Sequence, residues 1–208
     1  GGVLAGWTIL EATDVSADGR TIVGHAYDPS SVLQAWIVHL DGGPMTSICL
    51  PGESGVIVCP CGNPPASSGR GCQNSSHTGG AQLVASGAAS IAGDTLLFAT
   101  SGEKPTALSI VLQGPSRLAA GAVFGQGVRC VSGSLKRLYT KAASGGTIVA
   151  PTGSDLPVHA RSAALGDPIT AGSDRYYMVY YRDPTVLGAC PAGSTFNATQ
   201  SGKVTWAM

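Results

Sequence analysis

The sequence predicts an all-β fold: an antiparallel β-sandwich stapled by disulfides, with an N-terminal three-stranded meander. Short stretches of alternating apolar and polar residues recur along the 208 residues and are bounded by Gly, Pro, Asn, Asp or Ser. This pattern is typical of strands joined by turns. No segment shows the periodicity of a convincing amphipathic helix. The chain also contains six Cys, an even number that favours a disulfide framework.

Eleven strands are expected, which suits a sandwich of antiparallel sheets. Three of them precede Cys49, and eight follow the segment from Cys49 to Gly80, where Pro, Gly, Ser and Cys dominate and regular structure is not expected. In chain order the expected strands span residues 7–13, 21–27, 33–40, 82–86, 95–100, 106–113, 134–142, 147–150, 175–182, 194–199 and 203–206.

The change of composition near Cys49 divides the chain at about residue 46. Residues 1–46 form the meander, and residues 47–208 form the Cys-rich sandwich. A three-stranded meander does not bury its apolar face alone. Residues 1–46 are therefore expected to pack on the rest of the chain or on another molecule.

The cysteines indicate an oxidising compartment. Six of them allow many pairings, and Cys59 and Cys61, separated by one Pro, are expected to have different partners. A zinc site is the competing interpretation, since thiolates and imidazole are the ligands that zinc prefers. Its ligands would be Cys59, Cys61, Cys72 and His77, but the spacing lacks a C-x2-C knuckle. We expect disulfides among Cys49, Cys59, Cys61, Cys72, Cys130 and Cys190, and no metal or other cofactor.

The N-terminal stretch resembles one HAF-type repeat of secreted bacterial proteins. The resemblance rests on the stretches Gly6–Leu10, Ala12–Gly24 and Ala35–Ile37 and covers about 35 residues. In that family the repeats occur in tandem and resemble propeller blades, whereas this chain contains one. The resemblance implies a repeat that needs a partner surface.

The remainder, from Cys49 to Trp206, resembles a Cys-rich domain of secreted, uncharacterised proteins from environmental bacteria. The resemblance implies secretion and a β-sandwich, and it implies no activity. The motifs that carry it are Cys59–Asn63, Gly69–Ser75, Gly127–Cys130, Leu135–Leu138, Tyr180–Pro184, Thr195–Thr199 and Val204–Trp206.

Composition excludes several classes of protein. Charged residues make up 12% of the chain and apolar residues 43%. The apolar fraction is that of a folded domain, and the charged fraction is about half the usual value, which excludes an intrinsically disordered protein. The net charge is zero and no basic run matches a phosphate backbone, which argues against a nucleic-acid partner. The longest apolar run, Leu96–Ala99, is too short to span a membrane.

No catalytic motif is present, and we expect no enzyme. The four histidines (His25, His39, His77 and His159) are the only bases near neutral pH, and no G-x-S-x-G elbow accompanies them. Most of the aspartates flank turn residues, where their carboxylates accept backbone hydrogen bonds. The run from Asp14 to Gly19 lacks the length and terminal Glu of a calcium loop, and we expect a hairpin turn there.

Residues 175–182 form the most distinctive strand. With alternating side chains, Tyr176, Met178 and Tyr180 share one face and Tyr177, Val179 and Tyr181 share the other. We expect one face in the core and the other at a contact surface. The candidates for contact surfaces are Trp7, Trp36, Tyr176, Tyr177, Tyr180 and Tyr181.

Two sequons, at Asn74 and Asn197, mark candidate glycosylation sites on surface loops. The chain begins Gly1-Gly2, without an initiator Met or signal peptide, and is expected to be a processed, secreted product.

The sequence therefore predicts a secreted structural subunit. Low charge leaves strand edges with little defence against pairing, and the meander needs a partner surface. Strands from residues 1–46 are expected to complete the sheet of a neighbouring copy, and such a head-to-tail contact produces a filament. The alternative is a carbohydrate-binding module that uses an exposed tyrosine strand.

Overall fold

A computed structural model describes residues 6–15, 21–39 and 43–208. The chain divides into two compact units, residues 1–43 and residues 44–208, which we call the meander and the body. The regular structure of the body is almost entirely antiparallel strand, and three disulfides join its segments. The disulfide-stapled all-β fold is thereby confirmed.

The meander contains the strands β1 (Thr8–Val15), β2 (Thr21–Tyr27) and β3 (Leu33–His39), in that spatial order. The pairing of β2 with β3 runs without interruption, whereas the register between β1 and β2 shifts twice. Gly24 on β2 pairs with Trp36 on β3, and a Cβ at Gly24 would lie 2.4 Å from the Trp36 ring. Only Gly lets the indole lie across the sheet there.

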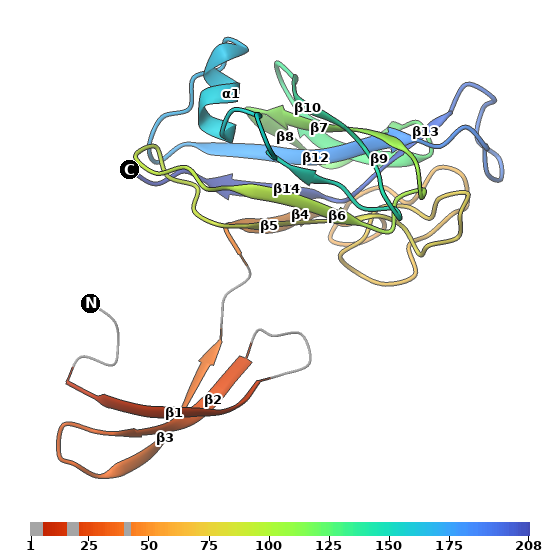
Figure 1. Cartoon of the computed structure of the whole chain (residues 1–208). Helices are drawn as coiled ribbons and strands as arrows, with labels where there is room; N and C mark the ends of the chain where they lie inside the picture. The colour runs from red at the N-terminus through yellow and green to blue at the C-terminus, as the bar shows by residue number, and fades with distance from the viewer. Residues whose placement is uncertain (1–5, 16–20, 40–42) are drawn as a thin grey trace. The chain divides into compact units, whose positions relative to one another are not determined.

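The largest sheet of the body, here called the main sheet, has the order β10-β7-β12-β14-β4, with β13 also paired to β12 (Figure 1). The strands of this sheet pair in antiparallel fashion. Its strands are β4 (Met45–Cys49), β7 (Leu108–Gly114), β10 (Lys136–Ala142), β12 (Asp174–Arg182), β13 (Phe196–Ala198) and β14 (Ser201–Thr205).

The two faces of the main sheet are covered to different extents. A minor sheet of β5 (Gln82–Ser86), β6 (Leu97–Ser101) and β11 (Val149–Ala150) packs on the inner face, where Phe98 and Trp206 are fully buried in the largest hydrophobic core. A hairpin of β8 (Ser116–Phe124) and β9 (Gly127–Ser132) covers part of the outer face, where Val131 packs with Met178. The outer face is thus partly open.

The disulfides join Cys49 to Cys130, Cys59 to Cys72 and Cys61 to Cys190. The expected disulfide framework is confirmed, and Cys59 and Cys61 do have different partners. The zinc interpretation is wrong, because its three thiolates are consumed in disulfides. Among the described residues no cluster of His, Cys, Asp or Glu has the arrangement of a metal site.

Four elements escaped the prediction from sequence. β4, β8 and β9 lie in stretches where no strand was expected, and the helix α1 (Val158–Ala164) lies where no helix was expected. The sequence of β8 is interrupted by small residues and its register with β9 shifts, so strict alternation is lost. α1 spans seven residues and buries only Val158 and Ser162, which is too little for a visible periodicity. The boundary predicted at residue 46 falls inside β4, which pairs with β14.

Among the described residues, no helix is long and apolar enough to cross a bilayer.

Candidate functional site

The tyrosine-rich strand β12 presents its side chains alternately to the two faces of the main sheet. Tyr177 and Tyr181 point into the inner core and are fully buried. The Tyr177 hydroxyl accepts a hydrogen bond from Trp206 Nε1 at 3.2 Å, and its ring lies 4.6 Å from Phe98. Burial raises the pKa of both tyrosine hydroxyls. The proposal that Tyr177 and Tyr181 form a contact surface is therefore wrong: the minor sheet covers them.

The opposite face of β12 remains partly accessible. Tyr176 and Tyr180 are half-buried on the outer face, where the β8–β9 hairpin leaves space beside them. The Tyr180 ring packs edge-to-face against Phe124 and Phe196, at 5.6 Å and 6.1 Å between ring centres. Phe124 and Phe196 are themselves 4.9 Å apart. Three aromatic rings from three strands therefore meet at one place.

These rings line a pocket of about 420 Å³, which we call the aromatic pocket. Gly125 follows Phe124 with φ of 62°, and a Cβ there would collide with Phe196 at 2.3–2.7 Å. The turn thus brings two of the three phenylalanines in the chain together. The residues that line the pocket are Leu112, Phe124, Leu135, Arg137, Tyr180 and Phe196.

A β-bulge places Arg137 in this pocket. The register between β10 and β7 shifts between Arg137 and Tyr139, so Leu138 and Tyr139 both enter the inner core while Arg137 pairs with Leu112 at the outer face. Arg137 is exposed, and its guanidinium forms no hydrogen bond or ion pair with any residue that the structure describes. Sequence analysis missed Arg137, Phe124 and Phe196 as site residues, because nothing in the local pattern joins β8, β10 and β13.

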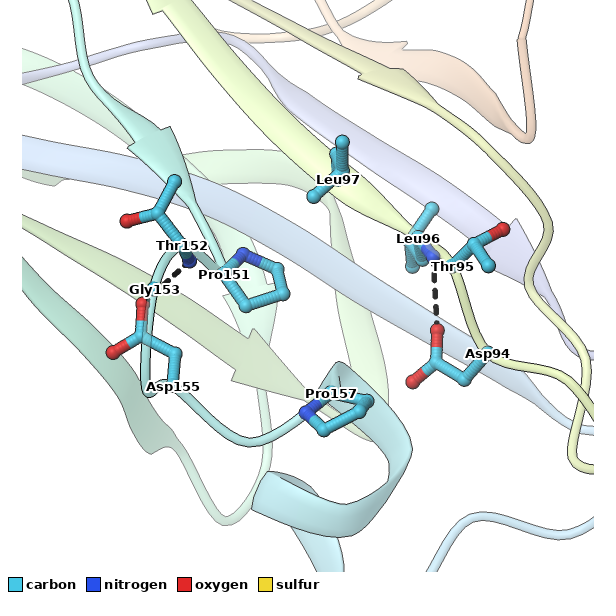
Figure 2. Close-up of a pocket in the computed structure, with 9 residues that line it drawn as sticks. All are labelled: Asp94, Thr95, Leu96, Leu97, Pro151, Thr152, Gly153, Asp155 and Pro157. Atoms are coloured by element: carbon cyan, nitrogen blue, oxygen red, sulfur yellow. Dashed lines mark hydrogen bonds between the residues drawn. The ribbon is translucent and has the colours of Figure 1, made fainter.

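A second pocket, of about 290 Å³, lies between the start of β6 and the loop after β11 (Figure 2). Asp94 and Asp155 stand on its opposite walls. Asp94 accepts hydrogen bonds from the Leu96 and His159 backbone amides at 2.9 Å and 2.7 Å. Asp155 accepts one from the Thr152 amide at 2.7 Å and pairs with Lys141. Both carboxylates hold loops in place, as predicted for aspartates at turns.

The nearest approach to a nucleophile cluster contains Ser75, Lys104 and Asp183. Lys104 Nζ donates to Ser75 Oγ at 2.8 Å, and Ser75 Oγ donates to the buried Asp183 carboxylate. A Ser–Lys pair needs a neutral amine to act as a base, whereas here the ammonium lies 3.8 Å from a carboxylate. The cluster is an ion pair bridged by a hydroxyl. Neither the His77 nor the His159 side chain hydrogen-bonds to a described residue.

The two sequons do not lie on accessible surface. Asn74 Nδ2 donates to Thr78 Oγ1, to the Gly102 carbonyl and to the Tyr181 hydroxyl. Asn197 Nδ2 donates to the Gln73 carbonyl at 3.0 Å and the Cys72 carbonyl at 3.3 Å. Both side chains are fully buried, and a glycan needs this nitrogen to face solvent. Asn74 and Asn197 are therefore structural residues, and their assignment as glycosylation candidates is corrected.

The meander contains the remaining predicted contact residues. Trp7 and Trp36 are both partly exposed. None of the described meander residues belongs to a hydrophobic core cluster, and Ile9 and Ile37 are 50% and 58% exposed. Residues 16–20, which include most of the predicted turn, lie outside the described residues. The three described strands of the meander thus do not bury these apolar side chains among themselves.

No protein family, curated protein or solved structure matches this chain.

Proposed function

We propose that the protein is a secreted structural subunit, and that strand β3 of one copy pairs with strand β4 of the next to form an extracellular filament. The observation that carries the proposal concerns the outer strands of the sheets. An outer strand has unpaired backbone N–H and C=O groups, which proteins protect with charges, bulges, short length or a covering segment. Among the described outer strands of the meander, the main sheet and the minor sheet, β3 lacks all of these protections, and β4 lacks charged residues although it is short and has one register shift.

In the meander the two outer strands differ. β1 contains Glu11 and Asp14 and its register with β2 is interrupted twice, so it is a poor template for another strand. β3 contains no Asp, Glu, Lys, Arg or Pro along seven residues, and its register with β2 is continuous. A flat, uncharged outer strand of this length is a favourable edge for pairing with another chain.

In the main and minor sheets of the body, three of the four outer strands are protected. β10 contains Lys136, Arg137 and Lys141 and a bulge, and β11 has only two residues. β5 is covered by one side chain: Gln200 accepts from the Leu83 amide at 2.9 Å and donates to the Leu83 carbonyl at 2.6 Å.

The fourth outer strand, β4, is the least protected of the four. It has no charged residue, and β14 is its only strand partner in the main sheet, although its register with β14 shifts once, at Ile48.

The meander does not cover its own apolar side chains. Among the described residues, seven of the sixteen large apolar side chains that are exposed lie between Ile9 and Ile37, although this segment is a small part of the chain. Covering them removes apolar surface from water and stabilises the contact by about 25 cal/mol per Å². A three-stranded sheet without its own core gains most from such a contact.

Pairing of β3 with β4 of another copy is head-to-tail, so it does not close on itself and extends into a filament. The three intramolecular disulfides are compatible with an extracellular protein. The charged fraction of 12% supplies little electrostatic repulsion between copies.

The test uses two edge variants, Ile37→Lys on β3 and Ser47→Lys on β4. Both side chains are exposed, so the substitutions leave the fold intact. Sedimentation velocity and negative-stain electron microscopy should show filaments of the unaltered protein and monomers of each variant. An equimolar mixture of the two variants should form dimers and nothing larger, because each variant keeps one working edge.

Ile9→Lys is the matched control, since Ile9 is exposed to a similar degree but lies on the protected strand β1. It should leave assembly nearly unchanged. A monomeric unaltered protein at high concentration would falsify the proposal. Loss of assembly in Ile37→Lys but not in Ser47→Lys would instead show that β3 pairs with β3 of another copy in a closed dimer.

Carbohydrate binding stays a prediction, and the tyrosine surface available for it is smaller than expected. Of the four tyrosines expected to form it, Tyr176 and Tyr180 are accessible in part and Tyr177 and Tyr181 are buried. A glycan array probed with a Tyr180→Ala variant tests it, and unchanged binding would exclude that tyrosine from any sugar site.

A further inference from the structure

We infer that the aromatic pocket binds a small organic anion with an apolar body and one carboxylate, such as an aryl or alkyl carboxylic acid. The pocket lies on the outer face of the main sheet, within the body. It is separate from the two strand edges proposed for assembly, so this inference does not rest on the proposed function.

The size and the walls of the pocket suit a small molecule. A volume of about 420 Å³ lies within the range of roughly 300–1,000 Å³ that is usual for ligand sites. Leu112 and Leu135 contribute aliphatic surface, and Phe124, Tyr180 and Phe196 contribute aromatic surface. The three rings contact one another edge-to-face, so the apolar wall is formed before any ligand arrives.

The charge in the pocket indicates the polar group of the ligand. Arg137 is the only charged residue among those that line it. Arginines elsewhere in the body are mostly engaged: Arg161 donates to the Leu138 carbonyl, and Arg175 pairs with Asp167 at 3.0 Å. The guanidinium of Arg137 has no such partner among the described residues. An unpaired guanidinium beside an apolar wall matches a carboxylate in charge and in its paired donor geometry.

The scarcity of polar groups decides against a neutral sugar. A sugar ring has hydroxyl groups on every side, and each that is buried needs a hydrogen-bond partner. Among the side chains that line the aromatic pocket, only the Arg137 guanidinium and the Tyr180 hydroxyl are polar. A ligand with one anionic end and an apolar remainder leaves fewer of its own groups without partners.

The test measures binding to the full chain by isothermal titration calorimetry, with 3-phenylpropionate as the probe. Its primary amide has nearly the same shape without the charge, and glucuronate has the charge on a polar ring. The carboxylate should bind saturably, and the amide and glucuronate should each bind at least tenfold more weakly. Added salt should weaken binding of the carboxylate more than that of the amide.

Arg137→Gln should reduce the affinity for 3-phenylpropionate at least tenfold. Arg117→Gln is the matched control, because Arg117 is also exposed and also lacks a partner among the described residues, but does not line the pocket. It should leave the affinity within twofold. Phe124→Leu should weaken the carboxylate and the amide by a similar factor, because it removes aromatic wall and no charge.

Equal affinities for the carboxylate and its amide would overturn the inference, because the charge would then have no role. An equal loss in Arg117→Gln would show a nonspecific charge effect, and absence of saturable binding of 3-phenylpropionate would remove the site altogether. Unchanged urea unfolding curves of the variants exclude a loss of fold as the cause.

Discussion

Replacing Asn74 with Ala should destabilise the protein strongly even though Asn74 stands in a sequon. The two hydrogens of its Nδ2 are shared among three acceptors: Thr78 Oγ1 and the Gly102 carbonyl at 2.8 Å each, and the Tyr181 hydroxyl at 3.2 Å. Each lost hydrogen bond costs about 1 kcal/mol, and a buried polar group without a partner costs about 1–3 kcal/mol. Tyr181 is fully buried, so Asn74→Ala leaves the Tyr181 hydroxyl as such a buried polar group without a partner. We expect a loss of about 3 kcal/mol in the free energy of unfolding.

Urea unfolding followed by circular dichroism measures this loss. With a denaturant slope of about 2–3 kcal/mol per molar urea, the midpoint should fall by about 1 M. Ser76→Ala is the control, because it also destroys the sequon but keeps Asn74. Ser76 is partly exposed and its hydroxyl accepts only from Lys104, at 3.2 Å, so its loss should cost less than about 1 kcal/mol.

The comparison separates structure from glycosylation. If a sugar on Asn74 were what stabilised the protein, both variants from a glycosylating host would be destabilised equally. Protein made without glycosylation would then show no effect of Asn74→Ala. Either result, or a midpoint shift below about 0.3 M in Asn74→Ala, would refute the structural assignment.

Three further predictions concern the body. Burial raises the pKa of Glu103, although hydrogen bonds from Ser109 and Thr100 act in the opposite direction. The folded state therefore binds this proton more tightly than the unfolded state. As a result, the free energy of unfolding falls as pH rises above the ordinary glutamate pKa. As the pH rises from 4 to 8, the unfolding free energy of Glu103→Gln should therefore increase relative to that of the unaltered protein. A difference between the two proteins that stays constant over this range would contradict the prediction. Replacing Cys61 and Cys190 with alanine should lower the free energy of unfolding by about 2 kcal/mol more than replacing Cys59 and Cys72, because the bridged loops span 129 and 13 residues. Equal urea midpoints of the two double variants under non-reducing conditions would contradict this. Gln200→Leu should lower the free energy of unfolding, measured in urea, by about 2–3 kcal/mol, since both backbone groups of buried Leu83 lose their partner. It should also increase self-association, because it exposes the edge of β5. Unchanged stability would show that water replaces the Gln200 amide.

Part of the molecule follows from local pattern alone. Strict alternation in β12 correctly separates Tyr177 and Tyr181 from Tyr176 and Tyr180, because the side-chain period of a strand is a property of the backbone. The disulfide framework also follows, because an even set of six cysteines in a turn-rich chain favours disulfides over other uses. Strands such as β5 were expected with their observed bounds.

Other features depend on which segments meet. The two sequons have the residues of surface sites, yet Asn74 and Asn197 are buried because distant loops and strands supply their partners. The aromatic pocket joins Phe124 and Phe196, which are far apart in the chain. Its charged residue, Arg137, reaches the outer face through a bulge that alternation cannot reveal.

By itself, therefore, the sequence determined the all-β class, the alternating faces of the strands and the presence of the staples, since each depends on residues close in the chain. Only the tertiary structure decided which cysteines pair, which tyrosine face is buried, which asparagines are buried and hydrogen-bonded, and which strand edges are least protected. The physical reason is that burial and hydrogen-bond satisfaction belong to contacts between distant segments. The edge of β5 illustrates this, since it is closed by Gln200, 117 residues further along the chain.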